Sequence, residues 1–292
     1  MNCDQQVTPI TNDGSAGAIF APGRSPVSDA MEPAGAAVIV NADDWGRDNA
    51  TTDRCLDCFL LGAVSSVSAM VFMEDSERAA DLARHHGVDA GIHLNFTLPF
   101  SAAHCPARLK QHQERLSRLL SSHRFAPVLY HPFAAASFEY VVKAQLEEYE
   151  RLYGAAARRV DGHHHMHLCT NVLMQELLPG GIIVRRNLSF ARGEKGFFNR
   201  FYRHQQDRRL ARRHRIADFF FDLQPLEPRR RLEEIFNLSE RFDIEVETHP
   251  IHDEEYRFLA DGELMRGAGE GAVVRGYVLR FCNPGVGVGR SS

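Results

Sequence analysis

Short apolar segments that alternate with helical segments organise this chain. Residues 37–42, 64–72, 88–94 and 243–247 are apolar or β-branched runs of strand length, with further candidates just before residue 161 and at 181–186 and 217–223. Residues 49–61, 73–86, 107–120, 137–153 and 228–242 have the apolar pattern or the end residues of helices. Strands that alternate with helices are typical of a parallel sheet. The pattern predicts an α/β fold, specifically a (β/α) barrel in complete or incomplete form.

Polar residues stand where five of these strands end. They belong to segments that are far apart in the sequence, namely residues 41–44, 91–95, 161–167, 185–186 and 247–250. In parallel α/β folds, ligands bind at the carboxyl ends of the strands. We therefore expect the five segments to meet in one pocket.

One of these segments is unusually rich in histidine. Histidines occupy four of the five positions from 163 to 167, the exception being Met166. Neutral imidazole is the commonest nitrogen ligand for metals, and histidine titrates near physiological pH. The cluster lies in the middle of the chain, so it is not a terminal purification tag. Metal binding or catalysis is the preferred interpretation, and a solvated histidine-rich loop is the alternative.

Asp43, Asp44 and His93 are weaker indications when each is taken alone. Loops favour Asp, and a single histidine in an apolar strand is more often a hydrogen-bonded core residue. Adjacent residues of an extended strand point to opposite sides, although the end of a strand can turn both carboxylates inward. Together with the histidine cluster, one Asp and two His would form a three-ligand site with open positions. Catalytic zinc sites have this form, and other divalent ions also suit it.

Such a site predicts metal-assisted hydrolysis of an amide or an ester. The metal can acidify a water molecule or polarise a carbonyl group. A nearby carboxylate can take a proton from the water, and a further histidine can protonate a leaving amine. Two alternatives remain open at this point. The chain is a metal-dependent phosphoesterase or another amidohydrolase, or it is a metal- or sugar-binding protein without turnover.

Composition excludes several other classes. The formal net charge of −4 argues against a general attraction to nucleic acid, and the arginine-rich residues 208–215 include no Phe, Tyr or Trp. No run of 18 apolar residues indicates a membrane span. The six cysteines form no disulfide framework, and Cys55 and Cys58 are interpreted as buried small side chains rather than a redox or zinc pair. Residues 1–35 lack the pattern of a signal peptide, so we expect a flexible extension, a single domain over residues 36–292 and a cytoplasmic location.

Four motifs together resemble the YdjC-like carbohydrate deacetylases, the ChbG/HpnK group. They are Asn-Ala-Asp-Asp-Trp-Gly at 41–46, Gly-Ile-His-Leu-Asn at 91–95, Asp-Gly-His-His-His-Met-His at 161–167 and Glu-Thr-His-Pro at 247–250. Their order and spacing match over roughly residues 36–260. The resemblance implies a distorted, TIM-like (β/α) barrel related to the polysaccharide deacetylases. It also implies removal of acetyl groups from N-acetylated sugars with a divalent metal, Mg²⁺ or Zn²⁺. The oligomeric state stays open, with a homodimer as one option.

The resemblance also assigns roles by position. Asp44, His93 and His163 resemble the metal ligands. Asp43 resembles the general base, and His249 is the best candidate for the general acid. The remaining candidates would support these residues or contact the sugar: His165, His167, Arg185, Asp161 and Glu247.

Four positions depart from the usual pattern of the family. Trp45 stands where Phe is usual, and Arg47 stands where the family has Leu or a similar residue. Gly162 replaces a familiar Ser, and Ile251 replaces a Gly that often follows the His-Pro pair. None of these changes removes an expected ligand, so they bear on substrate choice more than on catalysis.

Overall fold

The computed structural model describes residues 38–189 and 196–267 of the chain. The predicted N-terminal extension, residues 1–35, lies outside the described residues, as do residues 268–292 of the predicted single domain.

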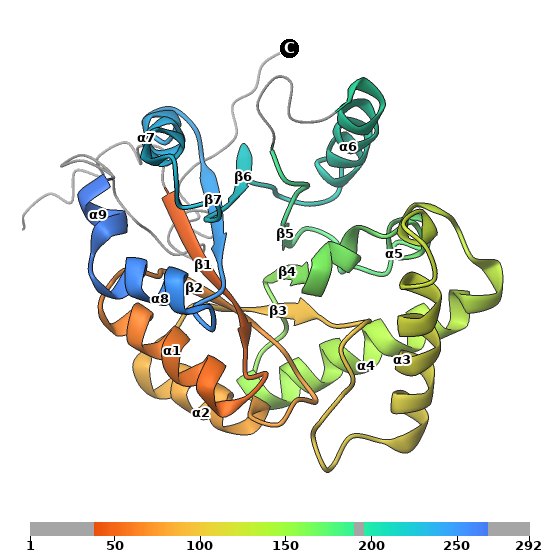
Figure 1. Cartoon of the computed structure of the whole chain (residues 1–292). Helices are drawn as coiled ribbons and strands as arrows, with labels where there is room; N and C mark the ends of the chain where they lie inside the picture. The colour runs from red at the N-terminus through yellow and green to blue at the C-terminus, as the bar shows by residue number, and fades with distance from the viewer. Residues whose placement is uncertain (1–37, 190–195, 268–292) are drawn as a thin grey trace, which may run out of the picture. The chain divides into compact units, whose positions relative to one another are not determined.

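A single sheet of seven parallel strands runs through the described part of the chain. The strands are β1 Val38–Trp45, β2 Ser66–Ala69, β3 Ala90–Leu94, β4 Arg159–Gly162, β5 Ile183–Val184, β6 Phe219–Asp222 and β7 Ile244–Thr248. Their order in the sheet is β5-β4-β3-β2-β1-β7-β6, and every neighbouring pair is parallel. Figure 1 shows the sheet curled into a half-barrel, with helices around its outer side. The predicted α/β barrel-like fold is confirmed.

Helices connect the strands. They are α1 Asn49–Leu60, α2 Ser76–His86, α3 Ala107–Leu120, α4 Ala135–Tyr153, α5 Thr170–Met174, α6 Phe197–Leu210, α7 Arg229–Leu238, α8 Asp253–Ala260 and α9 Glu263–Gly267, with 3₁₀ turns η1 Ala126–Val128, η2 Pro132–Ala134 and η3 His163–Leu168. The side chain of Asp48 caps α1 by accepting a hydrogen bond from the Thr51 N–H. Gly87 and Gly154 end α2 and α4 in the left-handed conformation that favours glycine. Within residues 38–189 and 196–267, no helix has the length and apolar character that crossing a membrane requires.

The two faces of the sheet differ in chemistry. Val38, Val40 and Ala42 of β1 belong to the main hydrophobic core together with residues of the surrounding helices. The alternate residues of β1 point to the other, inner side, as successive strand residues must. There Ile39 packs with Ile183 of β5 in a small apolar cluster. Elsewhere the interior of the half-barrel contains several buried charged residues, among them Asp43, Asp161 and Arg185, together with the ring of Phe220.

Backbone hydrogen bonds bring the two edges of the sheet together. The Val184 N–H donates to the Arg215 carbonyl at 2.9 Å, and the Ser189 N–H donates to the Phe220 carbonyl at 2.7 Å. β5 itself therefore contacts the segment before β6, and Ser189 after β5 contacts β6. This closure places the carboxyl end of β5 beside those of β4 and β7.

Several element boundaries differ from the sequence predictions. The predicted strand over residues 64–72 is wrong in its second half, because β2 ends at Ala69 and Phe72 adopts a left-handed φ of 58°. The apolar residues after Ala69 are buried in a turn, and a buried turn has the same apolar pattern as a buried strand. The helix predicted over residues 228–242 ends at Leu238. Cys55 and Cys58 are both buried and free, as expected.

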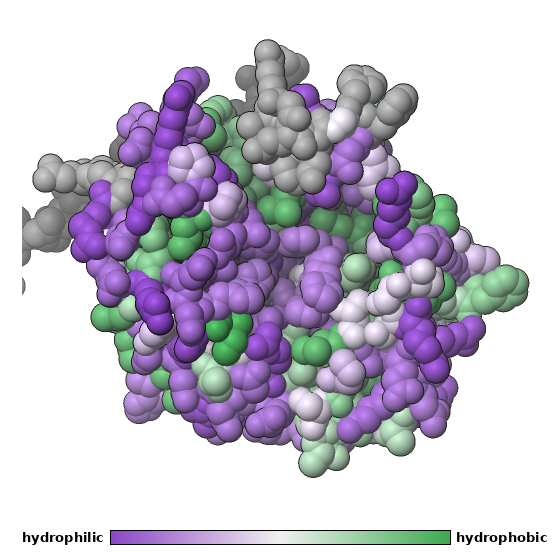
Figure 2. Space-filling model, viewed as in Figure 1, coloured by the Kyte–Doolittle hydropathy of each residue, from purple (hydrophilic) through white to green (hydrophobic). Residues whose placement is uncertain are grey.

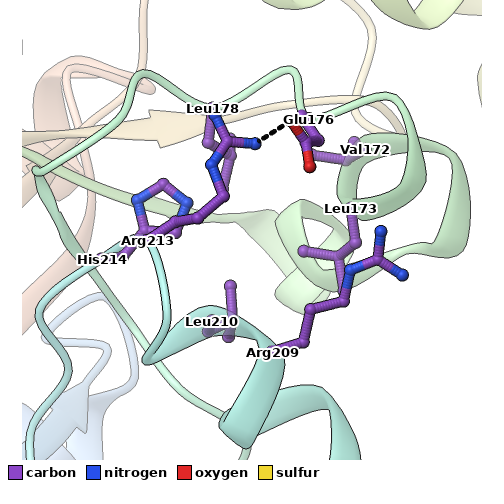
Figure 3. Close-up of a pocket in the computed structure, with 8 residues that line it drawn as sticks. All are labelled: Val172, Leu173, Glu176, Leu178, Arg209, Leu210, Arg213 and His214. Atoms are coloured by element: carbon purple, nitrogen blue, oxygen red, sulfur yellow. Dashed lines mark ion pairs between the residues drawn. The ribbon is translucent and has the colours of Figure 1, made fainter.

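The end of α6 packs against the segment that follows α5. Glu176 Oε2 and Arg213 Nη1 form an ion pair at 2.5 Å there. Figure 3 shows this pair at a pocket that Val172 and Leu210 also line. These residues line a cavity of about 30 Å³. That volume holds about one or two water molecules, so the cavity is too small for a metabolite.

Gly91 of β3 yields a test of the packing inside the half-barrel. A Cβ atom at this position would lie 2.7 Å from Cζ of Arg159. The guanidinium of Arg159 is buried and donates to the Val67 carbonyl and the Ser68 hydroxyl, so it has no room to move. We expect Gly91→Ala to lower the free energy of unfolding by about 1–3 kcal/mol, measured by urea denaturation.

Gly180→Ala is the matched control, because a Cβ at Gly180 would have no neighbour within 4 Å. Its effect should stay within about 0.5 kcal/mol. Equal stability of the Gly91 variant and the wild type would show that the Arg159 side chain is not held as tightly as its hydrogen bonds indicate.

Candidate metal centre and active site

An irregularity at the end of β1 directs two adjacent carboxylates toward one place. Ala42 pairs with Val67 of β2, and Trp45 pairs with Ala69 of β2. Between these two pairs β1 therefore has one residue more than β2. Asp44 has a left-handed φ of 65° within this bulge. Asp43 and Asp44 are each only 3% exposed. The bulge thus overcomes the usual alternation of strand side chains, and both carboxylates face His93 of β3, at 3.9 and 3.4 Å respectively.

His93 is held so that one ring nitrogen faces Asp44. Its Nδ1 lies 2.7 Å from Oδ1 of Asp161, its partner across the β3–β4 pair. Its Nε2 lies 3.4 Å from Oδ1 of Asp44. A carboxylate on the far nitrogen fixes the orientation of metal-binding histidines in many proteins. Asp161 therefore stands in a supporting position rather than in the group that faces Asp44.

His163 is the member of the histidine cluster that reaches Asp44. Its Nδ1 lies 3.0 Å from Asp44 Oδ1. The next residue, His164, is exposed and stacks on His163 with ring centroids 4.0 Å apart. Its Nδ1 lies 3.2 Å from the hydroxyl of Thr97. His164 and His165 both have left-handed φ values, 53° and 57°, and this backbone sends neighbouring histidines in different directions.

His165 and His167 contact other parts of the site. His165 Nε2 lies 3.5 Å from a carboxylate oxygen of Glu247, and its ring meets Phe220 edge-on. His167 is fully buried, with Nε2 2.9 Å from the backbone carbonyl of Arg185. Burial lowers the pKa of His167 to about 4, so its ring is neutral and donates that hydrogen bond. His167 thereby attaches the cluster to the end of β5.

Asp44, His93 and His163 form a group with the spacing of a divalent-cation site. One ligand atom from each of these residues lies within 4.8 Å of the others. One carboxylate and two imidazoles suit zinc and related divalent ions. A second group with the same spacing contains Asp43, His93 and Asp161. It is the poorer candidate, because both of its carboxylates already contact the guanidinium of Arg185.

Arg185 lies at the centre of the charged interior. It is 1% exposed and contacts four carboxylates. Its Nη atoms donate to both oxygens of Asp43, at 2.7 and 2.8 Å. Its other contacts are Glu245 at 2.5 Å, Glu247 at 3.2 Å and Asp161 at 3.2 Å. From the sequence, Arg185 either contacts the substrate or holds other site residues in place. Within the described residues, its side chain contacts the carboxylates of the site.

The carboxylates shape the electrostatics of this interior. Burial opposes protonation of His93, yet Asp43, Asp161 and Asp44 raise its pKa to about 10. Burial also opposes ionisation of Asp43, but Arg185 and His93 outweigh it and lower the Asp43 pKa. At Glu247, burial outweighs the effect of Arg185, and the negative charge of Asp43 acts in the same direction as burial. The pKa of Glu247 is therefore raised well above its usual value. The site therefore keeps Asp43 ionised and strongly attracts positive charge.

His249 follows β7 directly and borders an open cavity. The preceding residue, Thr248, pairs with Ala42 of β1, so His249 lies beside the end of β1 that carries Asp43. Its backbone N–H donates to Glu255 at 2.7 Å. A cavity of about 710 Å³ opens next to it, lined also by Asp222, Gln224, Ile251 and His252. Figure 2 shows that hydrophilic residues cover much of the middle of the view used in Figure 1.

Ser68 and Arg159 were not among the sequence candidates, and Asn41 lay in an expected segment without a role assigned to it. Asn41 donates to Asp43 and to the Ser68 hydroxyl, both at 2.7 Å. Ser68 in turn donates to Asp161, and Arg159 contacts both Ser68 and Asp161. A signal for Arg159 was present, because it lies two residues before Asp161 in a strand and therefore on the same face.

Comparison with known proteins identifies the family of this chain. Residues 37–270 match the family model described as YdjC-like protein. A carbohydrate deacetylase of Mus musculus is 31% identical over 143 residues, which cover 46% of this chain and 44% of that protein. A chitooligosaccharide deacetylase of Yersinia pestis (strain Pestoides F) is 30% identical over 138 residues, which cover 46% of this chain and 52% of that protein. The chain thus spans about half the length of the curated relatives it matches.

A solved structure shares the fold. It is that of a protein named for cellobiose-phosphate cleavage from Enterococcus faecalis V583, with a TM-score of 0.58 and 16% sequence identity. The likeness covers 83% of this chain and 98% of the other. With the family model matching most of the described residues, the chain belongs to the YdjC-like protein family.

Proposed function

We propose that this protein removes acetyl groups from N-acetylated sugars or oligosaccharides, with a divalent cation bound by Asp44, His93 and His163. The observation that carries the proposal is the convergence of these three ligand atoms within 4.8 Å of one another, beside the buried and ionised Asp43. Membership of a family whose named relatives include carbohydrate deacetylases supports it.

The cation would supply Lewis acidity, which polarises the acetyl carbonyl and makes a water molecule more acidic. Asp43 is the proposed general base. Two N–H donors of Arg185 and one of Asn41 hold its carboxylate in one orientation. Asp43 takes a proton from the attacking water as the new carbon–oxygen bond forms.

His249 is the proposed general acid. It lies at the carboxyl end of β7, the strand beside β1, and borders the large cavity where a sugar ring has room. Cleavage of the carbon–nitrogen bond leaves an amine that needs a proton, and imidazolium is a suitable donor. The products are acetate and a free amino sugar.

The donor set favours zinc over magnesium. Two of the three proposed ligands are imidazoles, which suit zinc, whereas magnesium prefers oxygen ligands and retains several water molecules. Acetate release from a panel of N-acetylated mono- and oligosaccharides, with each metal supplied separately to chelator-treated protein, tests substrate and metal together. Absence of acetate from every substrate and metal combination would contradict the proposal.

Other hydrolytic activities belong in the same panel. Phosphate monoesters and simple amides test the phosphoesterase and amidohydrolase alternatives, and two metal ions per chain would favour them. Sugar binding without any turnover would identify a binding protein. A homodimer and a cytoplasmic location remain predictions.

Asp43→Asn should keep its metal but lose activity. Asp43 lies outside the proposed ligand group, while removal of a general base typically lowers turnover by about 10²- to 10⁴-fold. Metal content by elemental analysis and acetate release measure the two effects separately. Full activity in this variant would show that another group acts as the base.

His163→Ala should reduce the bound metal, because this change removes one of the three proposed ligands. His164→Ala is the matched control, since His164 is the exposed neighbour that contacts Thr97 instead of Asp44. Metal stoichiometry after gel filtration measures both variants. Unchanged metal content in His163→Ala, or an equal loss in the control, would move the ligand assignment to another histidine.

Arg47→Leu should bind the metal more tightly. Arg47 Nη1 lies 2.8 Å from Asp44 Oδ2, so a positive charge stands beside the proposed ligand. Arg47 is partly exposed, so removing that charge should raise affinity only about two- to fivefold. Competition with a chromogenic chelator measures the dissociation constant, and Arg78→Leu on α2 is the control with its own carboxylate partners. Weaker binding in Arg47→Leu would mean that Arg47 chiefly maintains the conformation of Asp44.

A further inference from the structure

The loop that carries His249 is fixed through the backbone of that residue. The N–H of His249 donates to Oε2 of Glu255 at 2.7 Å, and its carbonyl accepts from the N–H of His252 at 2.9 Å. The second bond closes a β-turn over residues 249–252, and Pro250 occupies the position of the turn that favours its fixed φ. Because both backbone polar groups of His249 are satisfied, its main chain is held in one place.

Glu255 connects this loop to the end of β7. It is the third residue of α8 and is 1% exposed. Its Oε2 also accepts from the hydroxyl of Thr248 at 2.6 Å, and Thr248 is buried and pairs with Ala42 of β1. A glutamate at the third position of a helix often bonds the N–H of the capping residue. Glu255 reaches further back along the chain, to His249, and so joins the first turn of α8 to the last residue of β7 and to the loop between them.

Arg54 of α1 holds the same loop from another side. Its Nη1 donates to the Ile251 carbonyl at 2.8 Å, and its Nη2 pairs with Asp253 at 2.7 Å. The guanidinium also lies over the ring of Tyr256, 5.0 Å from the ring centroid. Figure 1 shows α1 and α8 side by side, as these contacts require. Arg54 is partly exposed, so its ion pair contributes less than the buried contacts of Glu255.

A general acid acts only from an accurate position. The imidazole has to come within hydrogen-bond reach of the leaving nitrogen, about 2.6–3.2 Å, and a displacement of about 1 Å can lower turnover about 10²-fold. The ring of His249 meets that of His252 edge-on, with centroids 5.9 Å apart, and such a contact is less directional than a hydrogen bond. The position of the ring at the cavity therefore depends on how firmly the main chain of His249 is held.

We propose that Glu255 is a positioning residue for the general acid, with Arg54 in support. Its carboxylate holds the main chain of His249 where the imidazole reaches the leaving amine, while the proton itself comes from His249. The inference rests on the proposed function, in which His249 is that acid. Glu255 lies outside the four sequence motifs that resemble the family, six residues after His249. Because Glu255 also borders the cavity, direct contact with the sugar is the competing role.

Steady-state kinetics of the full chain on an N-acetylated sugar separate the two roles. Glu255→Ala should lower kcat about 10²-fold with KM unchanged, since general acid–base catalysis typically contributes about 10²- to 10⁴-fold. Glu255→Gln keeps an oxygen acceptor for both hydrogen bonds, so its kcat should stay within about fivefold of the wild type. Glu148→Ala is the matched control, because Glu148 is a buried helical glutamate that contacts Arg151 and His104 instead. A raised KM with kcat unchanged in Glu255→Ala would assign Glu255 to sugar contact and overturn the proposal.

Double variants show whether Glu255 acts through His249. In the His249→Ala background the group to be positioned is gone, so Glu255→Ala should have no further effect on kcat. Residues that act as a unit show non-additive losses of this kind. Arg54→Leu, a change at a partly exposed residue, should give the same pattern with a smaller fall in kcat, and it replaces Glu255→Ala if that variant does not fold. Independent losses in the double variants would show that the two residues act elsewhere.

Hydrogen exchange tests the same contact without any turnover. The N–H of His249 should exchange about tenfold faster in Glu255→Ala than in the wild type, because its buried acceptor is gone. Glu148→Ala should leave that exchange unchanged, and thermal melting checks that each variant is folded. A wild type that releases no acetate would refute the proposed function, while exchange would still report whether Glu255 holds the loop. Unchanged exchange at His249 in folded Glu255→Ala would refute the positioning role whatever the activity.

Discussion

Ion pairing of Arg185 holds the inner side of the half-barrel together. The guanidinium follows β5 and contacts carboxylates on β1, β4 and β7, so it links the carboxyl ends of four strands. Removing one partner of a buried ion pair typically costs about 3–5 kcal/mol, because the other charge is left uncompensated. The same contacts keep Asp43 ionised and fix its orientation. Stability and the proposed chemistry therefore depend on one side chain.

Three of the five non-glycine residues with positive φ in the described part of the chain lie around the proposed metal centre. Asp44, His164 and His165 all have positive φ, in a region that residues other than glycine rarely adopt. Each such residue costs of the order of 1–3 kcal/mol and persists only where surrounding contacts maintain it. At Asp44 the strain lets two adjacent carboxylates face the same histidine. At His164 and His165 it separates four histidines, so that His163 faces Asp44 while His167 attaches the cluster to β5.

Much of the site followed from the order of the strands. The carboxyl ends of parallel strands share one edge, so the aspartates, His93 and the histidine cluster had to lie near one another. The orientation of each histidine could not be predicted, because it depends on the positive φ of His164 and His165. A sequence pattern contains no information on the sign of φ at these two residues. Arg185 and Arg186 present the same difficulty. The family resemblance singled out Arg185, but the adjacency of the two arginines did not itself show which of them enters the interior. In the structure Arg185 is buried there, next to the contacts between β5 and β6.

The sequence by itself determined the parallel α/β architecture, the family and the set of segments that form the site, because periodicity and motif order are properties of the chain alone. Tertiary structure decided which atoms meet. The bulge at Asp44, the register that pairs His93 with Asp161 and the burial of Arg185 among four carboxylates arise from contacts between distant segments. Tertiary structure also placed Glu255 of α8 against the backbone of His249. Such contacts depend on strand register and side-chain direction, which a linear pattern of residue types does not specify.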